Sequence, residues 1–459
     1  MLIDARRIPS GEVIETEVCI LGAGPAGITA AQEFLGKDVR VCLLETGGTE
    51  YSEPIQQLAS AEGNSIGDFY PGAYWMRHRE FGGTAHRWNI ALGNGKPGVR
   101  YVPFDPIDFE KRDEVPYSGW PITKADLDPY YERAQAVCQI GPYHYAAADW
   151  ADSQAQPFEF SSGNLFTKMF QCGPRDVFIE QYREQFRQSA NISTYLYATA
   201  VELETDELGQ TVTRVRVATL EGNQFHVAAK WVIVAKGGIE STRLLLLSNQ
   251  VQQNGLGNQH GLVGRFLMDH QMVRAGLLKP TSPALFKELA LYDLRPVQGT
   301  DVIGKFLLSE EMMRRHRLLN TATAIFPRSS IYSWNPMRML FPKGKNYRSK
   351  SVAAVQALLK AKRERTLPAN LLSQLAHIAI GLDDILYLQL RRKPLFSHPT
   401  GIYGFDQGGW SALPNPQKQF GLFEVVHLAE QAPDPNNRIT LGTERDALGC
   451  PKVKLYWRW

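Results

Sequence analysis

Cysteine is scarce in this chain of 459 residues, and the few cysteines present are widely spaced. They are Cys19, Cys42, Cys138, Cys172 and Cys450. The number is odd and no Cys-x-x-Cys pair occurs, so the spacing predicts neither a disulfide framework nor a zinc site. We therefore predict no metal site and expect buried thiols without a chemical role.

Net charge and long apolar runs are also lacking. The chain has 50 basic and 47 acidic side chains, a formal balance of +3, which excludes the strong field that holds a polyanion. No window approaches the roughly 20 uninterrupted apolar residues of a membrane-spanning helix. The opening residues 1–7 are followed by polar residues and not by the apolar core of a secretory signal. We expect a soluble, cytoplasmic protein of about two or three folding units.

A glycine-rich turn near the N-terminus is the first motif that carries chemistry. An apolar strand from residue 16 runs into Gly22-Ala-Gly24-Pro25-Ala26-Gly27, and an amphipathic helix follows. In such a turn Gly22 permits the tight bend, Gly24 lets the backbone approach a pyrophosphate, and Gly27 lets helix and strand pack closely. The anion would sit, next to Pro25 and Ala26, at the positive end of the helix.

A second strand, residues 39–44, ends at Glu45, roughly 20 residues past the glycines, where a carboxylate can accept hydrogen bonds from an adenosine ribose. The alternative is a structural turn with Glu45 as a solvated strand end. From 46 to about 120 the regular βα alternation of a nicotinamide domain is missing, which favours FAD over NAD. We expect residues 228–235, a buried-strand pattern, to complete the sheet.

Several further segments match one family in the same order. The matching segments are residues 22–27 with Glu45, 81–88, 120–131, 232–244, 263–270 and 437–441. Together they resemble the glucose-methanol-choline family of FAD-dependent oxidoreductases, and its pyranose oxidase and sugar or alcohol dehydrogenase branch in particular. The resemblance spans nearly the whole chain.

The resemblance implies a second set of flavin contacts. Gly82, Gly83 and Thr84 can expose backbone amides to an anion or a ring edge, and Trp88 offers a flat apolar wall. In the family this segment lies along the isoalloxazine and the pyrophosphate; the alternative is a glycine loop with Trp88 in the core. Arg87 occupies the place where some members attach FAD covalently through histidine. We therefore expect non-covalent FAD.

Residues 194–219 alternate in polarity on both sides of a turn at 208–210, which predicts an antiparallel hairpin or meander. The hairpin resembles the small sheet that covers adenine in the family, and by that resemblance the backbone at Val201 contacts adenine. The alternative is an edge hairpin without a ligand. The resemblance also places Gly237, after the predicted strand 228–235, at the cofactor.

The remaining segments suggest a second region. Residues 265–330 and 400–440 alternate as strands and carry aromatic side chains such as Phe405, and in the family this region forms the substrate-facing sheet. Residues 350–392 show helical apolar faces. The basic stretch 343–365 could contact anionic lipid or a redox partner, but we favour a solvated face.

Oxidation of an alcohol needs a base that takes the hydroxyl proton while hydride moves to the flavin. In the family a histidine from a further C-terminal segment does this, and its motifs are not found before Trp459. His86, His270 and His427 are weak substitutes, so the catalytic residue stays unknown. From this ending we expect a truncated enzyme, or one that a partner chain completes.

The sequence as a whole predicts an α/β fold, α+β overall. A Rossmann-like FAD-binding domain with a parallel sheet and a small antiparallel meander would span 12–264, with a loop-rich excursion at 46–190. A largely antiparallel substrate domain with helices, C-terminally incomplete, would span 265–459. The expected reaction is dehydrogenation of a small-molecule alcohol or sugar by hydride transfer to FAD. The alternatives are a non-catalytic flavin-binding scaffold and an NAD-dependent dehydrogenase.

Overall fold

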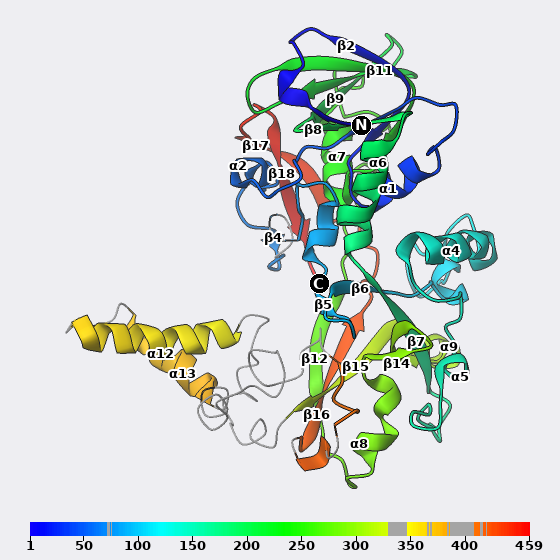
Figure 1. Ribbon diagram of the computed structural model, residues 1–459, viewed down its shortest axis with the longest axis vertical. Helices are drawn as coiled ribbons and strands as arrows, with labels where there is room; N and C mark the ends of the chain where they lie inside the picture. Colours follow the sequence, from blue (N-terminus) through cyan, green and yellow to red (C-terminus); the bar gives the residue numbers. More distant parts are fainter. Residues whose placement is uncertain are drawn as a thin grey trace.

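The computed structural model has two large sheets at opposite ends of its long axis (Figure 1). It describes residues 1–70, 74, 76–328, 347–364, 367, 370–382, 385, 408–413, 416–418 and 420–459. No helix among these residues is both long and apolar enough to cross a membrane.

The first sheet is the nucleotide-type sheet that the sequence predicts. Its five parallel strands, in spatial order, are β1 (Leu2–Asp4), β8 (Ile192–Leu196), β3 (Val41–Leu44), β2 (Val13–Leu21) and β11 (Gln224–Val234). Leu43 and Ile20, on neighbouring strands, are fully buried, as strands covered on both faces should be. The predicted strand at 228–235 is confirmed, because β11 pairs with β2 from His226 to Val234.

Two antiparallel strands, β10 (Val212–Ala218) and β9 (Thr199–Thr205), extend this sheet beyond β11. The predicted meander is therefore confirmed, but its start was wrong. Residues 194–196 belong to the parallel strand β8, which pairs with β3. Tyr197, at φ 61°, takes the chain out of β8 before β9 begins, and a left-handed residue of this kind interrupts a strand.

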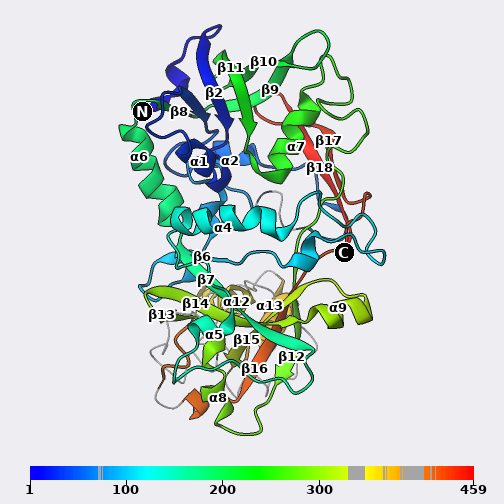
Figure 2. The same ribbon diagram turned by 90° about the vertical axis from the view of Figure 1, so that its right-hand side faces the viewer.

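Helices cover the parallel sheet. The chief ones are α1 (Pro25–Gln32), α6 (Tyr182–Gln188) with the π-helical turn η4 (Val177–Gln181) before it, and α7 (Gly237–Leu247). Ile28 of α1 and Phe186 of α6 are fully buried in one core cluster with strand residues such as Ile20 and Leu43. Figure 2 shows α1 and α6 on one side and α7 on the other. The carboxyl ends of β2 and β11 therefore lie between helices.

The second sheet is predominantly antiparallel. Its strands, in spatial order, are β12 (Gln271–Leu278), β16 (Leu422–Ala429), β15 (Thr321–Arg328), β14 (Thr300–Leu308), β7 (Leu165–Pro174), β6 (Pro97–Tyr101) and β5 (Ile90–Ala91), with β13 (Arg295–Val297) paired to β14. A parallel sheet with a meander and an antiparallel sheet with helices confirm the predicted fold class. Strands β5 to β7 come from the excursion at 46–190.

A third, smaller sheet has three strands. It consists of β17 (Arg438–Arg445), β18 (Pro451–Trp457) and β4 (Ile66–Gly67). β17 and β18 pack against α7 (Figure 2). The segment that holds β17 and β18 therefore lies beside α7, and Arg243 of α7 donates a hydrogen bond of 2.6 Å to Asp446.

The other helices are short, apart from α4 and a helical pair. They are η1 (Ala5–Arg7), α2 (Glu53–Gln57), η2 (Gly83–Arg87), η3 (Pro106–Phe109), α4 (Lys124–Cys138), α5 (Ala147–Trp150), α8 (Leu285–Glu288), η5 (Ala290–Tyr292), α9 (Glu310–His316), α12 (Tyr347–Glu364), α13 (Leu371–Ile380) and η6 (Pro416–Lys418). Most of them lie at the surface of the two large sheets.

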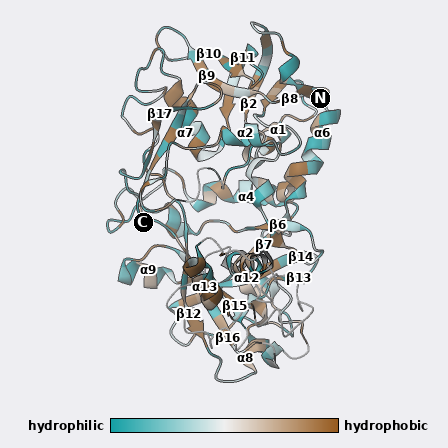
Figure 3. Cartoon of the chain, turned by 90° about the vertical axis from the view of Figure 1, so that its left-hand side faces the viewer, coloured by the Kyte–Doolittle hydropathy of each residue, from teal (hydrophilic) through white to brown (hydrophobic). Residues whose placement is uncertain are grey.

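The predicted helical stretch at 350–392 forms the pair α12 and α13, which project from the body (Figure 1). Asn370, at φ 57°, precedes α13 and separates the two helices. α13 is strongly apolar (Figure 3), yet Leu372 is 84% exposed. Phe405, residues 386–392 and the two ends of the basic stretch, 343–346 and 365, lie outside the described residues.

Candidate functional site

The glycine turn after β2 has the geometry that its sequence predicts. Gly22 has φ +102°, and a Cβ there would lie 2.7 Å from the carbonyl oxygen of Ala235 after β11. A Cβ at Gly27 would lie 1.8 Å from the Gly22 carbonyl oxygen. Gly24, by contrast, faces open space, with Gly83 Cα as the nearest atom at 3.9 Å. Gly22 and Gly27 thus close the turn tightly, and Gly24 leaves its backbone open to a ligand.

The second glycine loop packs directly on the first. Gly82 donates a backbone hydrogen bond of 2.8 Å to the Ala23 carbonyl oxygen. Gly83 has φ +53°, and a Cβ there would lie 2.8 Å from Gly24 Cα. The two loops approach so closely that only glycine fits at position 83. Segments about 60 residues apart in the sequence therefore form one wall of backbone.

Glu45 lies at the carboxyl end of β3, buried to all but 6% of its surface. Its two carboxylate oxygens accept hydrogen bonds from the backbone N–H groups of Ala23, at 2.9 Å, and Gly47, at 2.8 Å. Burial raises the pKa of Glu45, and those two N–H groups, with Arg79 and Lys236, act against the rise. Glu45 thus holds the glycine turn in place, a role that the sequence does not reveal.

A cavity of about 610 Å³ opens at these loops. Of the residues predicted for the cofactor, Gly22, Gly24, Pro25, Ala26, Glu45, Gly83, Thr84 and Gly237 line it. They come from the turn after β2, the start of α1, the residue after β3, the second glycine loop and the N-terminus of α7. The structure therefore brings eight predicted positions together around one cavity, at the carboxyl ends of β2, β3 and β11.

The other four predicted positions are not among the residues that line this cavity. Gly27 packs inside the turn, and Gly82 lies against Ile179. Trp88 packs edge-on against Tyr101 and Phe178, with ring centroids 6.3 and 5.8 Å away. Val201 is buried in β9. Cofactor contacts at Trp88 and Val201 stay predictions.

Charged residues that the sequence analysis did not select also line the cavity. Glu240 of α7 forms ion pairs with Arg79, at 2.7 Å, and with Arg77 and Arg243. Burial alone would raise the pKa of Glu240, but the arginines outweigh burial and lower it. Burial lowers the pKa of Lys236, which follows β11, to about 8. The sequence feature that could have indicated these charged residues is the charged run at 77–80, just before the glycine pair at 82 and 83.

These residues fit a dinucleotide. The Nε atom of Arg79 is buried and has no hydrogen-bond partner among the described residues, and a buried donor of this kind calls for an acceptor. Gly24, Gly237 and Gly238 leave open space where a Cβ would stand. An anionic pyrophosphate can meet exposed backbone there, near Arg79 and the positive end of α1.

The three weak histidine candidates lie in different environments. His270 is 65% exposed at its side chain and pairs with Asp269 at 3.0 Å. The Nδ1 atom of His427 is 2.7 Å from the Thr323 hydroxyl oxygen, and the residues that line the cavity do not include His427. His86 packs near Glu80, and burial lowers its pKa. No catalytic base is assigned.

Comparison with known proteins finds distant relatives of this chain. No family model matches the chain. The chain is 26% identical over 304 residues to 6'''-hydroxyparomomycin C oxidase of Streptomyces lividus, which covers 55% of this chain and 54% of the relative. It is 24% identical over 311 residues to 2-methyl-1,2-propanediol dehydrogenase of Mycolicibacterium austroafricanum, covering 56% and 55%. The chain thus spans about half the length of the curated relatives it matches.

A solved structure of formate oxidase covers 98% of this chain and 78% of its own, with 16% identity and a TM-score of 0.41. The two curated relatives, matched over 304 and 311 residues, are an oxidase and a dehydrogenase.

Proposed function

We propose that this chain is an FAD-dependent oxidoreductase that dehydrogenates a CH–OH group of a small alcohol or sugar. The observation that carries the proposal is the cavity that both glycine loops and Glu45 line. The sequence relatives are named as an oxidase and a dehydrogenase, which is consistent with redox chemistry here. Truncation, completion by another chain and a cytoplasmic location stay predictions.

In this proposal each part of the cavity has a separate task. The open backbone at Gly24 and the Nε atom of Arg79 bind the pyrophosphate, since Gly24 leaves room for a ligand and Arg79 Nε is a donor without a partner among the described residues. The carboxylate of Glu45 binds the ribose hydroxyls while it keeps the Ala23 amide in place. Bound FAD supplies the acceptor for the hydride of the substrate carbon.

An absorption spectrum of the purified chain, or of the chain incubated with FAD and desalted, tests the proposal. Retained flavin gives visible bands that NAD does not, so bands at one equivalent support FAD and exclude the nicotinamide alternative. Reduction of a dye acceptor with alcohols or sugars then separates an enzyme from a flavin-binding scaffold. A chain that retains no flavin after reconstitution would contradict the proposal.

Substitution of Glu45 by alanine is expected to weaken FAD binding by about 1–3 kcal/mol, the scale for loss of hydrogen bonds to a charged group. The loss has two causes. The variant lacks the hydrogen bonds to the ribose, and it also lacks the carboxylate that accepts hydrogen bonds from the N–H groups of Ala23 and Gly47. The quenching of flavin fluorescence on titration with protein measures the affinity.

Glu17→Ala is the matched control, since Glu17 is also a glutamate of this sheet but bonds Lys230 and the Arg40 amide away from the cavity. Equal FAD affinity in the Glu45→Ala variant and the wild type would remove Glu45 from the ribose site.

A further inference from the structure

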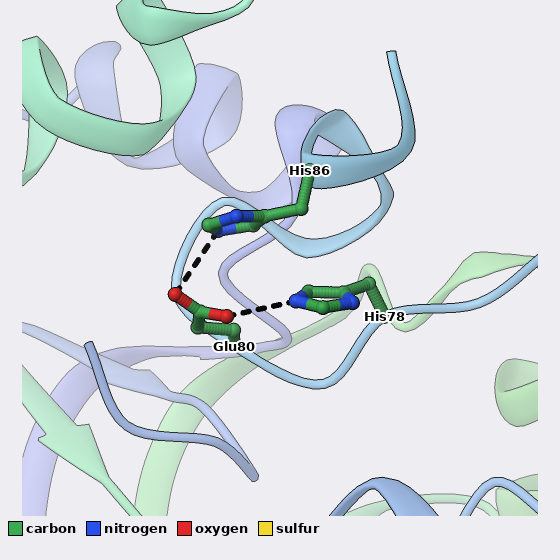
Figure 4. Close-up of side chains that lie close together, drawn as sticks. All are labelled: His78, Glu80 and His86. Atoms are coloured by element: carbon green, nitrogen blue, oxygen red, sulfur yellow. Dashed lines mark hydrogen bonds and ion pairs between the residues drawn. The ribbon is translucent and has the colours of Figure 1, made fainter. Parts of the chain in front are cut away.

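Two histidines and a glutamate lie together just before and within η2. The side chains of His78, Glu80 and His86 each offer a ligand atom, and these atoms all lie within 4.8 Å of one another. We call them the His-Glu-His cluster. Figure 4 shows Glu80 beside the two imidazoles, with one oxygen toward each ring. Its oxygens are 2.8 Å from His78 Nε2 and 3.5 Å from His86 Nε2.

The glycine pair at 82 and 83 brings these side chains together. Gly82 and Gly83 have φ +100° and +53°, and consecutive left-handed residues reverse the chain in a way that other residue types resist. The reversal places His86 above Glu80 (Figure 4). A Cβ at Gly82 would stand 3.3 Å from His86 Nε2, so the ring fits where position 82 has no side chain.

The cluster is buried and only partly satisfied by hydrogen bonds. The side chains of His78, Glu80 and His86 are 8, 9 and 16% exposed. The His78 and His86 rings lie 4.6 Å apart. His86 Nε2 is 2.9 Å from the Phe81 carbonyl oxygen, but His78 Nδ1 is buried without a partner among the described residues. Packing alone does not explain two neighbouring imidazoles beside one carboxylate at this depth.

We propose that the His-Glu-His cluster binds one Zn²⁺ ion, with one ligand atom from each residue. Two imidazole nitrogens and one carboxylate oxygen are a donor set that suits this metal, and three protein ligands leave a fourth position open. Cysteine spacing gave no sign of the site, because its ligands are histidine and glutamate.

A cavity of about 720 Å³ borders the cluster and gives access to that fourth position. Tyr51 and Glu53 line the cavity and add oxygen atoms, and Arg87 lines it with opposite charge. With neutral imidazoles the cluster carries one negative charge, from Glu80. The glutamate at 53 adds a second negative charge, which balances Arg87. The surroundings therefore accept a divalent cation.

The site has a structural consequence for the neighbouring loop. An ion held by His78 on one side of the glycine pair and by His86 on the other would fix the loop between them. Gly83, within that loop, abuts Gly24 of the first turn. Zinc at this place would stabilise the loop pair, whether or not the proposed flavin chemistry is correct.

Titration of tag-free, chelator-treated protein with ZnCl₂, followed by calorimetry, tests the proposal. We expect one equivalent to bind and the unfolding temperature to rise, as binding to the folded state alone requires. CoCl₂ as a second probe should give the intense visible bands of a four-coordinate site. In Glu80→Ala and His78→Ala, Zn²⁺ affinity should fall by more than the roughly 10–100-fold that loss of a supporting group causes.

His226→Ala is the matched control, because His226 also pairs with a glutamate, Glu204 at 3.2 Å, outside the cluster. This variant should bind Zn²⁺ as the wild type does. If the variants at 78 and 80 do not fold, the wild type still provides a test: Zn²⁺ should protect His78 and His86 from diethyl pyrocarbonate, read by mass spectrometry. The proposal would be overturned if the wild type bound no stoichiometric Zn²⁺, or if the folded variants at 78 and 80 bound Zn²⁺ as the wild type does. Flavin retention is measured separately.

Discussion

Substitution of Gly27 by alanine is expected to lower the free energy of unfolding by about 3 kcal/mol or more, the upper part of the range for overpacking. A Cβ at this position would lie 1.8 Å from the Gly22 carbonyl oxygen. Because the Cβ is fixed by its own backbone and the oxygen also belongs to the backbone, no rotamer change relieves the clash. Helix propensity alone gives the opposite sign, since alanine is favoured over glycine within a helix by about 1 kcal/mol. Urea unfolding followed by tryptophan fluorescence measures the difference.

Gly276→Ala is the control for this experiment. Gly276 lies in β12, has no atom within 4 Å of an added Cβ, and does not have positive φ. Its substitution should change stability by no more than about 0.5 kcal/mol. Gly27→Ala should also lose FAD binding where it still folds. A Gly27→Ala protein as stable as the wild type would mean that α1 does not pack on the turn as described.

Removal of the Glu240 side chain is the second substitution with a large expected effect. Glu240 is 8% exposed and compensates the charges of Arg77, Arg79 and Arg243. Glu240→Ala would leave these buried guanidinium groups without their shared carboxylate, which typically costs about 3–5 kcal/mol. Chemical unfolding at pH 7 measures the loss. Glu311→Ala is the control, since Glu311 pairs with Arg315 on an exposed helix face and should contribute little.

The same residue predicts a pH dependence. The pKa of Glu240 in the folded protein lies below its unfolded value, because the arginines outweigh burial. The ion pairs therefore stabilise the protein fully above the unfolded pKa of about 4.3, and this stabilisation is lost as the pH falls toward the folded pKa. The stability difference between wild type and Glu240→Ala should shrink from pH 7 to pH 3. An equal difference at both values would contradict the ion-pair explanation.

The sequence predicted those parts of the site that depend on local geometry. The turn Gly22–Gly27, the strand that completes the sheet and the meander follow from residue type and periodicity over short distances. The predicted start of the meander was wrong, because the alternation of polarity at residues 194–196 is the same whether they belong to β8 or to the meander. Only pairing with β3, some 150 residues away, decides their place.

The charged part of the cavity could not be predicted in the same way. Arg79 and Glu240 are separated by about 160 residues, and no local sequence pattern predicts an ion pair between residues so far apart. The bonds from Ala23 and Gly47 to Glu45 depend on how the turn closes over β3. A carboxylate at a strand end predicts a ribose contact from residue type alone. The hydrogen bonds that it accepts from backbone N–H groups are seen only in the three-dimensional structure.

β11 belongs to two arrangements at once. Its residues 224–227 pair with β10 and its residues 226–234 pair with β2, which ends at the glycine turn. Because one continuous strand joins the meander to the parallel sheet, neither part can open without exposing the backbone of the other. Amide hydrogens of β10 and of β2 should therefore exchange with deuterium together, as one cooperative unit.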